Sequence, residues 1–182
     1  MTLGTTAVGF RLNAFTAPVP RPAAEVTIEM ASGGRLLLSS LKGKVVALEF
    51  VLTTCSHCQH SAAILQQMYQ ELGPQGFQPV GAAINPRAHT LLPAFVQRLG
   101  LKYPVGVTPQ PVAYEFLGAS VMEPLQMPQL VFIDRQGVVR AQYGAGDDFF
   151  KNEEVNTRNQ IVALLKGSGG AKSRRVGKPG VK

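Results

Sequence analysis

The spacing of apolar and polar residues divides most of the chain into short strands and amphipathic helices. Residues 26–30 and 35–38 lie on either side of the turn sequence Ser32-Gly33-Gly34, which predicts a β-hairpin. Residues 45–52 and 77–84 are almost continuously apolar, a pattern typical of strands covered on both faces. We therefore expect residues 45–52 to form a central, parallel strand.

A helical pattern follows this central strand. Between residues 62 and 72 apolar side chains recur at helical spacing, and Gly73-Pro74 ends the pattern. Residues 90–99 show a second helical pattern, in which Pro93 is tolerated only in the first turn. Further helices are expected at 112–117 and 155–165, and two strands at 129–134 and 137–143, joined by a turn.

The order of these elements indicates the fold class. Strands and helices alternate first and a strand hairpin follows, which implies an α/β fold: a mixed central sheet flanked by helices on both faces. The hairpin at residues 26–38 is expected to be an N-terminal extension of this fold. Residues 1–25 contain several prolines and are expected to form an extended lead-in without a strand or helix, so that order begins near Val26.

Composition and charge describe one soluble globular domain, expected at residues 26–166. With 182 residues, 45% of them hydrophobic and 16% charged, the chain can bury a core and is not collagenous, coiled-coil or disordered. The longest run without a formal charge, residues 50–70, is too polar for a transmembrane helix.

The net charge of +7 is concentrated at the C-terminal end. Residues 166–182 contain six basic residues and no acidic one, whereas the rest of the chain is nearly neutral. The charge of the domain therefore does not indicate nucleic-acid binding. Residues 167–182, rich in Gly, Ser and Lys, are expected to form a basic disordered tail.

The two cysteines, Cys55 and Cys58, lie where the central strand gives way to the first helix. A disulfide between residues so close in sequence constrains the unfolded chain very little, so the pair indicates redox chemistry or a metal. At a helix start, backbone N–H groups and the helix dipole favour a thiolate, so we expect the pKa of Cys55 to be lowered and Cys55 to attack the substrate. Cys58, one turn further, is placed to resolve the mixed disulfide.

This arrangement resembles the thioredoxin superfamily and, within it, the TlpA/ResA-like thiol-disulfide oxidoreductases. The resemblance spans residues 26–165 and includes the leading hairpin, the CxxC motif of Cys55 and Cys58, and Met127-Pro128 directly before an apolar strand. It implies a thioredoxin-like fold with an N-terminal β-hairpin extension. It also implies that the redox-active disulfide between the two cysteines serves without a further cofactor.

The resemblance further implies a groove for the substrate. Pro128 should be cis and face the disulfide, with Met127 beside it where the extended backbone of a substrate pairs. Thr54 and Ser56, which flank Cys55, are expected to line the same groove. Thr54 stands where the family often has an aromatic residue and the chain has no Trp, so we expect a more polar, wider lip.

Two further residues are candidates for a part in the chemistry. Glu49 precedes Cys55 by the spacing of the buried aspartate of thioredoxins, and burial would raise its pKa and suit it to take and return a proton for Cys58. His57 directly precedes Cys58, as in strongly oxidising members of the superfamily, and would stabilise the Cys55 thiolate. His60 is expected to be a surface residue.

The resemblance leaves the direction of electron flow open. TlpA/ResA-like proteins are usually reductants, and we expect this chain to reduce protein disulfides; an oxidase or isomerase tuned by His57 is the alternative. The partners implied are protein thiols and disulfides, with a membrane electron donor left open. The implied location is extracytoplasmic, periplasmic or membrane-tethered, although no membrane anchor is visible in the sequence.

Metal binding and peroxidase chemistry are two alternatives to disulfide exchange. Cys55, His57, Cys58 and His60 include ligands suited to Cu(I) or Zn²⁺, but no second Cys or His pair completes a closed site, so we expect no metal site. Copper handling by a binding protein remains an alternative function. Peroxidases of related fold resemble one another in a threonine three residues before the reactive cysteine, and Leu52 stands there instead.

Overall fold

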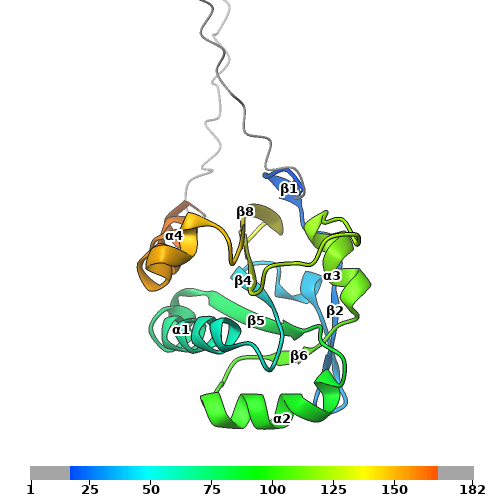
Figure 1. Cartoon of the computed structure of the whole chain (residues 1–182). Coiled ribbons are helices and arrows are strands. Elements are labelled where there is room, and N and C mark those ends of the chain that lie inside the picture. Colours follow the sequence, from blue (N-terminus) through cyan, green and yellow to red (C-terminus); the bar gives the residue numbers. More distant parts are fainter. Residues whose placement is uncertain (1–16, 168–182) are drawn as a thin grey trace, which may run out of the picture.

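The computed structural model describes residues 17–167, and its centre is one mixed sheet with helices on both faces. This confirms the fold class inferred from the order of the elements. Figure 1 shows the arrangement. The strands are β1 (Arg21–Pro22), β2 (Thr27–Met30), β3 (Arg35–Leu37), β4 (Val45–Val51), β5 (Phe77–Ala83), β6 (Val105–Val107), β7 (Gln129–Ile133) and β8 (Val138–Gly144). The α-helices are α1 (Ser56–Leu72), α2 (Ala88–Leu99), α3 (Gln110–Leu117) and α4 (Glu153–Gly167), and the 3-10 helices are Leu38–Leu41, Gly73–Gln75 and Asp148–Asn152.

The strands follow the order β1-β8-β7-β4-β5-β6-β2-β3 across the sheet. β4 lies in the middle, parallel to β5 and antiparallel to β7, and β5 is also parallel to β6. The expected hairpin is present as β2 and β3 and joins the sheet through β6. β6 was not predicted, because three residues are too few to show a period.

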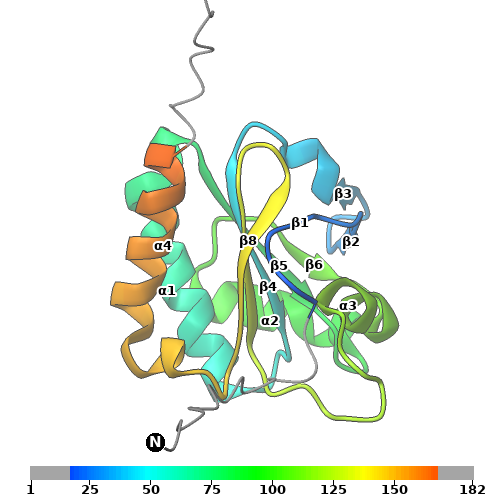
Figure 2. The ribbon, with the colours of Figure 1, turned by 90° about the horizontal axis from the view of Figure 1, so that it is seen from above.

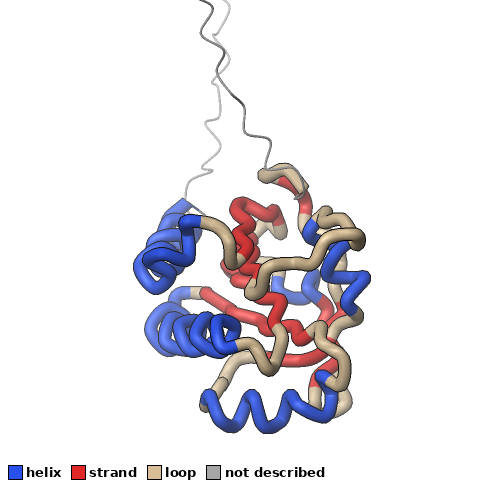
Figure 3. The backbone as a smooth tube through the Cα atoms, in the orientation of Figure 1, coloured by secondary structure: helices blue, strands red, loops and turns tan. Residues whose placement is uncertain are grey.

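Alternate residues of β4 enter two separate apolar cores. Val45, Ala47 and Val51 pack with side chains of α1, α2 and α4, whereas Val46 and Phe50 pack with α3 and the segment around the β2–β3 hairpin. Figures 2 and 3 show α1 and α4 side by side on one side of the sheet, with α3 on the other. A side chain of β4 is therefore buried whichever way it points.

The lead-in differs from the expectation that order begins near Val26. Arg21 and Pro22 form β1, which pairs with β8 at the sheet edge. The guanidinium of Arg21 donates hydrogen bonds to the carbonyl oxygen of Phe116 at 2.9 Å and to Oε1 of Gln142 at 2.6 Å. Proline at an edge strand removes no inner hydrogen bond, which is why the proline content did not exclude a strand. The expected disordered tail lies outside the described residues.

Pro93 is also placed differently from the prediction. α2 begins at Ala88, so Pro93 lies inside the helix and not in its first turn. The residue before the helix, Arg87, adopts the left-handed conformation with φ 61°. The periodicity begins later than the helix because the residues of its first turn, apart from Ala88, are largely exposed.

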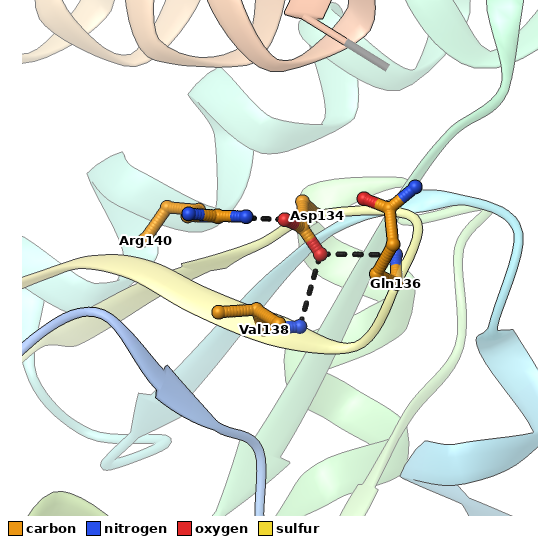
Figure 4. A network of polar contacts seen from close by, with 4 residues as sticks. All are labelled: Asp134, Gln136, Val138 and Arg140. Atoms are coloured by element: carbon orange, nitrogen blue, oxygen red, sulfur yellow. Dashed lines mark hydrogen bonds and ion pairs between the residues drawn. The ribbon is translucent and has the colours of Figure 1, made fainter. Parts of the chain in front are cut away.

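Asp134 stabilises the turn between β7 and β8 (Figure 4). Its carboxylate accepts hydrogen bonds from the backbone N–H groups of Gln136 at 2.9 Å and Val138 at 3.0 Å, and from Nε of Arg140 at 2.6 Å. Burial acts to raise the pKa of Asp134, but these hydrogen bonds and the Arg140 charge outweigh it and hold that pKa below its usual value. The hairpin that begins directly after Pro128 is thus fixed at its far end.

The contacts of Arg21 predict a measurable contribution of the lead-in to stability. Arg21→Ala should lower the free energy of unfolding by about 1–2 kcal/mol, because hydrogen bonds from charged groups are lost and a carbonyl oxygen is left without its donor. Denaturant unfolding measures the change. The matched control is Arg35→Ala, at an exposed position of β3. Equal unfolding midpoints for the two variants would show that the lead-in contributes nothing.

Candidate active site

Cys55 and Cys58 lie at the junction of β4 and α1. Cys55 is the residue that caps α1, and its sulfur accepts a hydrogen bond from the backbone N–H of Cys58 at 3.4 Å. Cys55 is partly exposed, whereas Cys58 is completely buried, and both are free thiols. One sulfur is thus open to a partner from outside and the other is accessible only from within the protein.

The loop that carries Cys55 is anchored by a residue that the sequence analysis did not identify. Asn85, just beyond β5, accepts a hydrogen bond from the backbone N–H of Thr53 at 2.9 Å and donates one to the Thr53 hydroxyl at 3.1 Å. Gln59 donates a further hydrogen bond to the carbonyl oxygen of Thr53 at 3.3 Å. The signal was available, because sites in α/β folds collect at the carboxyl ends of parallel strands, where Asn85 lies.

The Met127–Pro128 peptide bond faces the exposed thiol. The bond is cis, as the resemblance implied. The Cys55 thiol donates to the carbonyl oxygen of Met127, with sulfur and oxygen 3.9 Å apart. The register explains this meeting, since Phe50 near the end of β4 pairs with Gln129 at the start of β7.

Thr54 and Ser56, the other residues predicted to line the groove, are both exposed. They flank Cys55 in sequence and stand at the surface where β4 passes into α1. Their side chains are small and do not cover the Cys55 thiol. A partner can therefore approach Cys55 from this side.

Glu49 is fully buried in β4, as the sequence predicted. It pairs with Gly81 and Leu130 on the neighbouring strands and lies on the same side of β4 as Ala47 and Val51, so its side chain points toward α1 and α4. Neither of its carboxyl oxygens has a hydrogen-bond partner among residues 17–167. An ionised carboxylate is strongly disfavoured in such a place.

The electrostatics of Glu49 and Cys58 follow from this burial. Burial raises the pKa of Glu49 to about 8; the nearby Ser61 hydroxyl acts to lower it, and the charges of Glu153 and Cys55 raise it further. Burial also raises the pKa of Cys58, and its interactions with Cys55 and Glu49 add to that rise. Both groups therefore favour their protonated forms.

Tyr103 and Glu153 interact electrostatically with Glu49, and the sequence analysis identified neither residue. Burial raises the pKa of Tyr103, with a contribution from Glu49, and the Tyr103 hydroxyl donates to the carbonyl oxygen of Ala62 at 3.3 Å. Burial likewise raises the pKa of Glu153, the first residue of α4. No period or motif distinguishes either residue in the sequence, because only the packing of distant segments brings them to Glu49.

His57 and His60 are exposed and line an open cleft beside the thiols. The cleft has a volume of about 640 Å³ and is also lined by Pro128 and by the start of α4. Both imidazoles act to lower the pKa of Glu153. The surface position expected for His60 is confirmed, and it is shared by His57.

The sequence raised the questions of a metal site and of a membrane-spanning helix. Over residues 17–167, no three side chains of His, Cys, Asp or Glu come close enough together to hold a metal ion. Cys55, His57, Cys58 and His60 therefore do not form a ligand set as they lie here. Within the same part of the chain, no helix has the length and apolar character needed to cross a membrane.

Comparison with known proteins relates the chain to one family. The model of the AhpC/TSA family matches residues 19–142. This range includes β4, both cysteines and the Met127–Pro128 bond. No curated protein sequence matches the chain.

Solved structures share the fold over nearly their full length. A thiol:disulfide interchange protein of the thioredoxin family from Chlorobium tepidum TLS is 21% identical, with a TM-score of 0.68 over 82% of this chain and 99% of the other. A proposed interchange protein DsbE from Chlorobium tepidum is 24% identical, with a TM-score of 0.65 over 80% and 96%. A proposed protein disulfide isomerase from Bacteroides thetaiotaomicron is 25% identical, with a TM-score of 0.65 over 84% and 92%.

The burial of Glu49 predicts a pH-dependent cost in stability. Its pKa of about 8 in the folded protein exceeds the ordinary 4.5, so between these values the folded state keeps a proton that the unfolded chain releases. Stability is therefore lost as the pH rises from about 4.5 to about 8. The glutamine of Glu49→Gln does not ionise, so this variant should not lose stability over the same pH range. At about 1.4 kcal/mol per pKa unit, its free energy of unfolding near pH 8 should exceed that of the wild type by a few kcal/mol.

Denaturant unfolding of the reduced proteins at a series of pH values measures this difference. The control is Glu123→Gln, which makes the same change at an exposed loop position. Its stability should follow that of the wild type throughout. A constant difference between Glu49→Gln and the wild type from acid to alkaline pH would contradict the prediction.

Proposed function

Because the chain belongs to the AhpC/TSA family and is a thioredoxin-like oxidoreductase, we propose that it exchanges its Cys55–Cys58 pair with the cysteines of other proteins, acting as a reductant. The observation that carries the proposal is the asymmetry of the two thiols. Cys55 is partly exposed beside Met127, and Cys58 is buried near a carboxyl that can take its proton. Thiol-disulfide exchange needs one attacking and one resolving thiol in this relation.

The reaction proceeds in two exchanges. The Cys55 thiolate attacks one sulfur of the target disulfide; a mixed disulfide forms, and the other target sulfur leaves as a thiolate and is protonated. Cys58 then gives its proton to the ionised Glu49 carboxylate and attacks Cys55, so that the Cys55–Cys58 bond forms and the second target thiolate leaves. The target gains two electrons and the protein dithiol loses them.

The surroundings of Cys55 suit an extended substrate segment. Pro128 and Met127 are proposed to pair with the substrate backbone, and the exposed Thr54 and Ser56 to contact it on the other side of the thiol. The cleft beside Pro128 offers further room for side chains of the partner. The proposed partners are protein thiols and disulfides. From the family resemblance we also propose that the reaction takes place outside the cytoplasm.

The electrostatics at Cys58 support a reductant. A disulfide becomes strongly oxidising when the protein stabilises a thiolate in the reduced pair. Burial and the neighbouring Glu49 act in the opposite direction at Cys58, since they raise its pKa. His57 lies exposed on the cleft, where it acts on Glu153. The alternative of an oxidase or isomerase requires that His57 control the pair instead.

The reduction potential of the Cys55–Cys58 pair decides between these directions. Equilibration against dithiothreitol or glutathione should give a value near about −270 mV, the range of thioredoxin reductants. His57→Ala should leave the value nearly unchanged. A potential between about −120 and −180 mV, shifted by His57→Ala, would establish the oxidase or isomerase instead.

The role of Glu49 predicts a kinetic defect confined to the second exchange. Reduced protein mixed with an aromatic disulfide that releases a coloured thiol reports both exchanges, because Cys55 attack frees the first thiol and Cys58 attack frees the second. Glu49→Gln should slow the second release about 100-fold, the lower end of what a positioned base contributes. The first release should be little changed.

The role of Glu49 also predicts how the rate of the second release depends on pH. In the wild type the second release should speed up as the pH rises toward about 8, because more Glu49 is then ionised and able to accept the proton. Glu49→Gln should remove that rise, while Glu123→Gln should retain it. A second release in Glu49→Gln as fast as in the wild type would exclude Glu49 as the proton acceptor.

A further inference from the structure

Four side chains between β4, α1 and α4 carry buried oxygen atoms for which the described part of the chain offers no hydrogen-bond partner. They are both oxygens of Glu49, Oγ of Ser61, Oε1 of Glu153 and Oγ1 of Thr157. Glu49, Ser61 and Thr157 are at most 1% exposed. Buried polar groups in proteins are nearly always paired with protein or with internal water, so a cluster of this kind indicates internal water between β4, α1 and α4.

Ser61 links the two carboxyls of this cluster. Its hydroxyl lies near enough to act on the pKa of both Glu49 and Glu153, lowering each, although it is not in bonding geometry with either. The two carboxyls also interact electrostatically, since the charge of Glu153 raises the pKa of Glu49. Thr157 follows Glu153 by one turn of α4 and lies on the buried side of that helix.

Glu153 connects the cluster to the solvent. One of its oxygens is buried, yet the residue also lines the open cleft, together with His57 and His60. Cys58 and Glu49, by contrast, are completely enclosed. A proton released by Cys58 therefore has no direct exit, and Ser61 is the group that acts both on the enclosed Glu49 and on Glu153 at the cleft.

We propose that Glu49, Ser61 and Glu153 form a proton path that carries the proton of Cys58 from the core to the cleft. The proposal rests on the disulfide exchange proposed above and names how its buried step is connected to the solvent. Glu49 takes the proton of Cys58; the Ser61 hydroxyl, with internal water, passes a proton on to the Glu153 carboxylate, and Glu153 releases it into the cleft. Each transfer breaks one bond to hydrogen and forms another, with no change in oxidation state.

The other titratable groups that face Glu49 do not offer a second path. Tyr103 lies on the same side of the sheet, but its hydroxyl already donates to the carbonyl oxygen of Ala62 and burial raises its pKa. Cys55 belongs to the reacting pair. His57 and His60 line the cleft with Glu153, where their charges act to lower the pKa of Glu153 and so favour the loss of its proton.

The test uses the two-step release of coloured thiol by the full chain, with Glu153→Gln compared with Glu154→Gln. Glu154 is the adjacent, exposed residue of α4, and its substitution removes the same charge. Glu153→Gln should slow the second release about tenfold, less than the loss of a directly acting base. Glu154→Gln should match the wild type, and the first release should be unaffected in both.

The pH profile separates proton transfer from electrostatics. Removing the charge of Glu153 lowers the pKa of Glu49, so electrostatics alone would make the second release faster at neutral pH. The proton path predicts the opposite: a slower second release, with a lower limiting rate at high pH. Rates for Glu153→Gln that equal or exceed those for Glu154→Gln across the pH range would overturn the proposal.

Ser61→Ala provides an independent second variant, since it removes one buried hydroxyl and leaves both carboxyls in place. It should also slow the second release above about pH 8, where Glu49 is ionised and the loss of the pKa-lowering hydroxyl no longer limits the rate. An unchanged rate there would overturn the path even if Glu153→Gln failed to fold. The two proposals fail in different ways. A wild-type protein that releases no second thiol would contradict disulfide exchange itself, whereas normal wild-type release with unaffected variants would contradict only the path.

Discussion

The enclosure of the Glu49 carboxyl between the central strand and α1 is the constraint on which the site depends. A carboxyl at this position cannot reach water and has no hydrogen-bond partner in the described part of the chain, so burial raises its pKa to about 8. That value is close to the pH at which thiols exchange disulfides. The same burial raises the pKa of Cys58, and in the proposed mechanism this keeps Cys58 protonated until Cys55 has reacted.

The sheet topology creates this enclosure. β4 lies between β5 and β7, so both of its faces are covered, and the carboxyl of Glu49 projects into the core formed with α1 and α4. The same order brings the end of β4 opposite the start of β7 and so places Cys55 against Met127. Burial of Glu49 costs stability as the pH rises, and the proposed proton transfer requires that burial. Apolar cores lie on both faces of the strand that carries it.

The sequence predicted the parts of this arrangement that are local. The apolar run of β4, the helix after the cysteines and the Met127-Pro128 pair each left a pattern that a single segment can carry. Glu49 was identifiable as a lone charge in an apolar strand. Glu153 was not identified, because its role arises from contacts between segments far apart in the chain. Asn85 was also missed, although its position at the carboxyl end of a parallel strand was a usable signal. β1 and β6 were missed because strands this short show no period.

The titration of Glu49 in the reduced protein tests the central claim most directly. Carbon-13 NMR of labelled glutamate, with Glu49→Gln to assign the signal, follows the carboxyl as the pH changes. The account predicts a midpoint near 8, far from the ordinary value of 4.5 for a glutamate. A midpoint for Glu49 near 4.5 would show that the carboxylate is ionised throughout the functional pH range, and it would contradict the claim that burial raises the pKa of Glu49.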